Sequence, residues 1–169
     1  DKQFIYFSYI MNAPQGSTLT GGLPSDGKVY EFRQFKKDKI GLYQINTSYI
    51  KGDETNNIAR SSITNITEAF VEVFKPAARS DESVLINLNS IILSEKLDSL
   101  SYIPSEYREY VSVDYGRSDD TKTFIKNVFN NDTNTAFEVT FAFENVMPNP
   151  DAYSVSAVTD PRYLSVTGR

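Results

Sequence analysis

The chain has 169 residues, of which 40% are hydrophobic and 13% aromatic, and its formal net charge is −5. This length and apolar share predict a folded, soluble domain rather than a disordered chain, and the negative charge argues against a nucleic-acid partner. Because the chain has no cysteine and no histidine, disulfides, thiolate chemistry, Ser-His-Asp triads and imidazole zinc sites are all excluded.

The N-terminal part of the chain is predicted to hold strands and one long arm. Residues 4–11 are apolar on both faces, as in a buried strand. Residues 12–28 hold four of the eight glycines and two of the seven prolines, which predicts a flexible arm or loop. Residues 28–35 and 39–50 are β-prone and joined by a charged turn, so they predict a β-hairpin.

Three segments in the middle of the chain have apolar residues at helical spacing. In residues 61–76 a helical stripe runs up to Pro76, although the six residues AFVEVF inside it would also suit a strand. Residues 91–103 space three leucines as a short helix does. Residues 119–131 place apolar side chains at i, i+1, i+4 and i+5, which also predicts a helix.

The remaining segments predict strands, at residues 84–89, 110–116, 136–144, 152–158 and 162–166. Strands near both ends with helices between them favour an α+β, β-rich fold, either an antiparallel sheet or a β-sandwich with two or three inserted short helices. One domain is expected to span residues 1–169. No apolar run approaches the roughly 18 residues that a membrane-spanning helix needs.

The sequence TAFEVTFAFENV alternates between an apolar and a polar face. Its apolar face holds Phe137, Val139, Phe141 and Phe143. A stacking platform for nucleic-acid bases would need basic residues and glycine beside its aromatics, and this segment has neither. The row is therefore predicted to be a wall of the core, with Glu138 and Glu144 facing solvent on the other side.

Two patterns come close to ligand-binding motifs and fail. Residues 22–29 resemble a phosphate-binding loop, but Val29 stands where the motif needs a hydroxyl, and a strand is predicted where it needs a helix. Residues 118–120 and 130–134 are rich in oxygen donors for Ca²⁺, yet the spacing of an EF-hand is absent. Turns and a helix cap explain both segments more simply, so neither a cofactor nor a metal is expected.

A cluster of tyrosines is the best surface candidate in the sequence. The segment SYIPSEYREYVSVDYG interleaves charged residues with Tyr102, Tyr107, Tyr110 and Tyr115. Tyrosine combines a large contact area with a polar tip, which suits protein interfaces and sugar-binding surfaces. Half-buried packing with the hydroxyls at the rim is the structural alternative.

The chain carries no motif specific enough to indicate a family or an activity. These features favour a non-catalytic structural or assembly subunit, of the type found in virions, phage tails or cell-surface appendages, and a virion or cell-surface location is slightly favoured. Its partner would be another protein or a second copy of the chain. The alternatives are a monomeric β-sandwich module that binds a glycan or peptide, and a carboxylate-dependent hydrolase.

Overall fold

The computed structural model describes residues 3–12, 22, 24–48, 57, 61, 67–97, 113–114, 117–144, 147–148 and 163–168. The described backbone forms antiparallel sheets with very little helix, which confirms that the fold is β-rich and antiparallel. The chain divides into two compact units: unit 1 is Asp1–Tyr6 with Gly27–Asn87, and unit 2 is Phe7–Asp26 with Leu88–Arg169. The expectations of a single domain and of a β-sandwich stay predictions.

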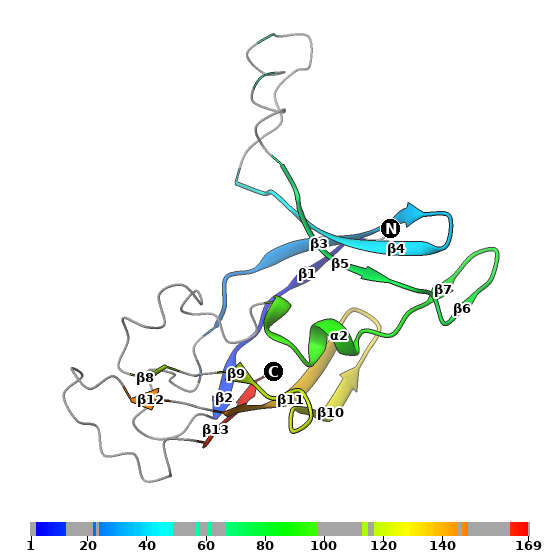
Figure 1. Cartoon of the computed structure of the whole chain (residues 1–169). Coiled ribbons are helices and arrows are strands. Elements are labelled where there is room, and N and C mark those ends of the chain that lie inside the picture. The colour runs from blue at the N-terminus through cyan, green and yellow to red at the C-terminus, as the bar shows by residue number, and fades with distance from the viewer. Residues whose placement is uncertain are drawn as a thin grey trace. The chain divides into compact units, whose positions relative to one another are not determined.

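Unit 1 is built on a four-stranded antiparallel sheet (Figure 1). Its strands, in spatial order, are β1 (Gln3–Tyr6), β3 (Lys28–Lys36), β4 (Lys39–Ile45) and β5 (Ala69–Phe74). β3 and β4 form the predicted hairpin, with Lys37 and Asp38 at its turn. Two further short strands, β6 (Ala78–Arg79) and β7 (Val84–Leu85), pair with each other.

Alternation along the strands gives the sheet of unit 1 two different faces. On one face Phe4 stacks on Tyr30 with ring centroids 5.8 Å apart, and Phe32 meets Phe74 edge-on at 6.0 Å. Tyr30 and Leu42 on this face are almost fully buried. This is the core face. Side chains alternate along each strand, so the immediate neighbours of these residues, such as Glu31 and Tyr43, lie on the opposite, outer face of the sheet.

Unit 2 contains a second antiparallel sheet and a short helical segment. Its strands are β10 (Phe124–Asn130), β11 (Thr135–Glu144), β13 (Tyr163–Gly168) and β2 (Ile10–Asn12) in spatial order, and β9 (Arg117–Ser118) pairs with the end of β11. A short ladder joins β8 (Val113–Asp114) to β12 (Met147–Pro148). The helical part is α2 (Asn89–Ile92) with the 3₁₀ turn η1 (Glu95–Leu97).

The aromatic row of β11 is a wall of the core of unit 2, as predicted. Val139, Phe141 and Phe143 are each at most 6% exposed and form one cluster with Ile10. The residues packed against this cluster are Ile92, Leu93, Ile125 and Phe137. Residues distant in sequence therefore meet on this face of β11, which buries enough apolar area to order the sheet.

The helix predicted over 119–131 is wrong in the described residues, because β10 is a strand. In residues 61–76 the strand alternative for AFVEVF is correct, because these six residues form β5. Each strand contains a register shift that leaves one residue extra, Val71 in β5 and Lys126 in β10. Across such a bulge, side chains three apart fall on the same face of the strand instead of side chains two apart. That spacing imitates one turn of a helix, which explains the helical pattern in both segments.

The other segments differ from their predictions mainly in extent. The helix predicted at 91–103 is limited to α2 and η1 up to Leu97, and residues 98–103 lie outside the described part of the chain. The strand predicted at 84–89 is only Val84–Leu85. The N-terminal segment forms two strands, β1 and β2, in different sheets. Residues 152–158 lie outside the described residues.

Candidate functional site

The structure leaves the site predicted from the sequence untested. Tyr102, Tyr107, Tyr110 and Tyr115 all lie outside the described residues, as do residues 13–21 and 23 of the arm. The segment that resembles a phosphate loop leads directly into strand β3, so no helix N-terminus follows Gly27. No helix in the described part of the chain is long and apolar enough to cross a membrane.

The two oxygen-rich segments form turns. Asn131 Oδ1 accepts hydrogen bonds from the backbone N–H groups of Thr133 and Asn134, each at 2.9 Å, in the turn between β10 and β11. Asp119 Oδ1 accepts from the backbone N–H of Thr121 at 2.9 Å and from its hydroxyl at 2.6 Å. Within the described ranges, no group of three or more acidic side chains is placed to hold a metal ion.

The structure brings together a different set of residues, on the outer face of the unit 1 sheet. The rings of Phe35 and Phe70 have centroids 5.0 Å apart, and those of Tyr43 and Phe70 are 4.8 Å apart. Phe35 and Phe70 are 38% and 47% exposed, respectively. We call Phe35, Tyr43 and Phe70, together with Gly41 beneath them, the aromatic face.

Gly41 makes the close packing of these rings possible. A Cβ built on Gly41 would stand 2.8 Å from Cε2 of Phe70 and 2.8 Å from Cε2 of Tyr43, closer than any real Cβ contact. The rings therefore lie against the bare backbone of β4, and a side chain at position 41 would displace them. The aromatic face is held in place by packing although two of its rings are substantially exposed.

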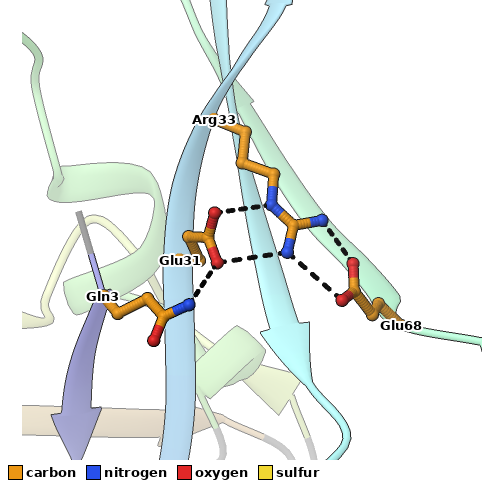
Figure 2. Close-up of polar contacts among 4 residues, drawn as sticks. All are labelled: Gln3, Glu31, Arg33 and Glu68. Carbon is orange, nitrogen blue, oxygen red and sulfur yellow. Dashed lines mark hydrogen bonds and ion pairs between the residues drawn. The ribbon is translucent and has the colours of Figure 1, made fainter. Parts of the chain in front are cut away.

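Beside these rings is a cluster of charged and polar side chains from β1, β3 and the residue that precedes β5 (Figure 2). Arg33 donates from Nε to Glu31 at 2.7 Å, and from Nη2 to Glu31 at 3.1 Å and Glu68 at 3.2 Å; its Nη1 also donates to Glu68. Gln3 Nε2 donates to Glu31 at 2.6 Å. We call Gln3, Glu31, Arg33 and Glu68 the ion cluster.

The ion cluster fixes the guanidinium next to the aromatic face. The Arg33 guanidinium carbon lies 5.1 Å from the centroid of the Tyr43 ring, within the range of a cation–π contact. Hydrogen bonds, first to Glu31 and then to Glu68, raise the pKa of Arg33 above its already high ordinary value. Arg33 therefore stays charged, and its two bidentate pairs limit the rotamers that it samples.

A basic turn lies at the opposite end of the aromatic face. Lys36, Lys37, Asp38 and Lys39 at the β3–β4 turn have a formal charge of +2, and Lys36 Nζ lies 5.3 Å from the Phe35 centroid. We call these four residues the basic tip. The ion cluster has a formal charge of −1, from two glutamates against one arginine. The aromatic face thus has opposite charges at its two ends.

Unit 2 holds a second polar cluster, which corrects the prediction for Glu138. Glu138 is buried, not solvent-facing, because Lys126 and Asn127 on β10 reach it with hydrogen bonds of 2.8 and 2.6 Å. Glu144, predicted to face solvent, is half-exposed and pairs with Lys122, which also lies 3.0 Å from Asp119. These contacts join β11 to β10 and to the turn before β10, and so stabilise the sheet of unit 2.

Comparison of the chain with protein-family models, with curated proteins and with solved structures found no match. The case for a function therefore depends on the geometry of the residues themselves. Sequence reasoning missed the aromatic face because its rings come from three strands up to 35 residues apart. The one local signal was Gly41 inside a predicted strand, a pattern that indicates close approach of other groups to the backbone.

Proposed function

We propose that the chain is a non-catalytic subunit that acts through protein–protein contacts, with the aromatic face of unit 1 as a contact surface. The observation that carries this proposal is the exposed pair Phe35 and Phe70, with Phe70 packed against Gly41 near the fixed guanidinium of Arg33. Water reaches both rings, so covering them with a partner would remove further apolar area from solvent.

The composition of the surface supports a protein partner. Phenylalanine, tyrosine and arginine are enriched at protein interfaces, where a few such residues provide most of the binding energy. Binding also requires that side chains lose conformational freedom, which opposes association. Because Phe70 is already packed on Tyr43 and Arg33 is held by Glu31 and Glu68, less freedom remains to be lost here than at a surface of mobile side chains.

The biological setting expected from the sequence, a virion, a phage tail or a cell-surface appendage, stays a prediction. The same holds for the glycan- or peptide-binding module and for the carboxylate-dependent hydrolase. The aromatic face favours protein contacts over the hydrolase in one respect: the two carboxylates beside it, Glu31 and Glu68, both accept hydrogen bonds from Arg33.

The proposal is tested by the absolute mass of the purified chain, measured by light scattering behind a sizing column over a wide concentration range. We expect the wild-type mass to rise with concentration, and the Phe70→Ser variant to stay closer to the monomer mass. Phe124→Ser is the matched control, because Phe124 is 52% exposed in unit 2. A wild type that stays monomeric throughout, or a Phe70→Ser variant that associates equally well, contradicts the proposal.

A further inference from the structure

We infer that the partner on the aromatic face is a second copy of the chain, related by a two-fold axis, so that the basic tip of each copy lies against the ion cluster of the other. This inference rests on the proposed function and specifies its partner. It is carried by the order of charged and apolar groups along the outer face of the unit 1 sheet.

The outer side chains of β3 have charges of opposite sign at the two ends of the strand. Glu31 and Arg33 of the ion cluster come first, Phe35 of the aromatic face follows, and Lys36 begins the basic tip. Five residues of extended chain separate Glu31 from Lys36, a length of about 17 Å. Phe35 therefore lies between Arg33 and the basic tip along β3, while Tyr43 and Phe70 lie beside Glu31 across the sheet.

A two-fold interface must be complementary to itself, because the same patch is used by both copies. Rotation by 180° about an axis that lies in the interface and runs across the strands exchanges the ends of the aromatic face, which places the tip of charge +2 on the cluster of charge −1 twice in each dimer. The same rotation brings the exposed rings of Phe35 and Phe70 against their counterparts. A face with one sign of charge at both ends would repel its own copy in this arrangement.

The groups at both ends of the face are ordered. Gln34 Nε2 donates a hydrogen bond to the carbonyl of Lys39 at 3.1 Å and another to the carbonyl of Lys36, which closes the turn of the basic tip. The ion cluster is closed by the bidentate pairs of Arg33. A second copy therefore meets a turn of ordered backbone at one end and a fixed guanidinium at the other, which favours one register over many.

A charge-swap experiment tests this arrangement. One variant, Lys36→Glu with Lys37→Glu, changes the basic tip from +2 to −2, and a second variant, Glu68→Lys, changes the ion cluster from −1 to +1. Each variant alone opposes like charges, so its self-association should weaken by at least about tenfold. A one-to-one mixture of the two matches opposite charges at both contacts, and should regain most of the wild-type affinity.

Two further variants control this experiment. Gln3→Lys changes the ion cluster from −1 to 0 without removing a partner of Arg33, so it should weaken self-association by a smaller factor, and it is used if Glu68→Lys does not fold. Asp132→Lys has the same net charge as Glu68→Lys but changes an exposed residue of unit 2. Because Asp132→Lys keeps both ends of the aromatic face, it should associate with itself as the wild type does, and it should not recruit the acidic-tip variant as strongly as Glu68→Lys does.

Equilibrium sedimentation of the single variants and of the mixture distinguishes the outcomes. Strong incorporation of the acidic-tip variant into mixed dimers with Glu68→Lys, weaker incorporation with Gln3→Lys, and the weakest with Asp132→Lys supports the two-fold arrangement. A wild type that associates while the mixture stays as weak as its components overturns the arrangement. That result is still compatible with the proposed function if Phe70→Ser prevents association. A wild type that remains a monomer overturns the inference as well.

Discussion

The ring of Phe70 lies against the backbone of Gly41, so close that a Cβ at position 41 would stand 2.8 Å from Phe70 Cε2. The two residues belong to adjacent strands, β5 and β4, and are 29 residues apart in sequence. Their contact holds an exposed aromatic ring flat on a sheet without enclosing it. The aromatic face is therefore an ordered surface, which is what a specific contact requires.

Gly41→Ala should displace the rings of Phe70 and Tyr43 while leaving the sheet folded. Phe70 is 47% exposed, so its ring has room to rotate away from an added methyl group. We expect altered ring resonances in the NMR spectrum and weaker association, with a small change in the unfolding midpoint. Gly27→Ala is the control, because its Cβ would meet nothing closer than 4.0 Å. Unchanged ring resonances in Gly41→Ala would contradict the packing described here.

Truncation of the β11 core wall should destabilise the chain strongly. Phe141 is 1% exposed, and Phe141→Ala leaves a cavity in addition to the lost apolar burial, with an expected loss of about 3–5 kcal/mol in the free energy of unfolding. Phe124→Ala changes the same residue type at 52% exposure and should stay within about 0.5 kcal/mol of the wild type. Urea unfolding of both variants measures the difference, and equal stabilities would show that β11 is not part of a core.

Removal of the Lys126 ammonium should leave the buried Glu138 carboxylate without one of its hydrogen-bond donors. Lys126→Met is expected to lower the free energy of unfolding by about 1–3 kcal/mol. The lower part of that range is favoured because the Lys126 side chain is 56% exposed. Adding Glu138→Gln should recover part of the loss, since a neutral amide tolerates burial better than a charge does. A double variant less stable than Lys126→Met alone would contradict this account.

Asp119 should contribute to stability in a pH-dependent way. The hydroxyl of Thr121 and then Lys122 hold the pKa of Asp119 below its ordinary value of about 3.9. A carboxylate whose pKa is lower in the folded state than in the unfolded state stabilises the fold. The full stabilisation is present when the pH is above the unfolded-state pKa, and it is lost as the pH falls through the folded-state pKa. Asp119→Asn keeps the acceptor oxygen of the turn and removes the charge.

We therefore expect the unfolding midpoint of Asp119→Asn to lie below that of the wild type at neutral pH, with a gap that narrows below about pH 4. Calorimetry at several pH values measures this gap. Thr121→Val should lower the midpoint in the same pH range, because it removes the hydroxyl that contributes most to the shift. A gap that is constant with pH would show that the charge of Asp119 does not act in folding.

The sequence predicted β11, whose alternation is unbroken, and shows a helical pattern in β5 and β10, where the alternation is interrupted. β11 alternates without a bulge between Thr135 and Glu144, and its core face was predicted residue by residue. In β5 the extra residue Val71 places Phe70 and Val73 on one face, and in β10 Lys126 does the same for Ile125 and Val128. A spacing of three then imitates a helix, and only the partner strand reveals the register shift.

The candidate site was less accessible to prediction than the fold. Phe35, Tyr43 and Phe70 meet only after three strands pair, so no local pattern in the sequence places them together. The burial of Glu138 likewise depends on its hydrogen bonds with Lys126 and Asn127. The incorrect prediction of a helix over 119–131 did not place these two residues on a strand next to β11. Strand register is the missing information in both cases, and it is set by non-local pairing.

The central claim, that a second copy covers the aromatic face, is tested most directly by hydroxyl-radical footprinting of the wild type at low and high protein concentration. The oxidation rates of Phe35 and Phe70 should fall as the concentration rises, while the rate of Phe124, exposed in unit 2, should stay constant. Protection of the first two rings alone would place the contact on the aromatic face. Constant rates at Phe35 and Phe70 while the mass of the particles increases would show that the copies meet elsewhere, and would contradict the account.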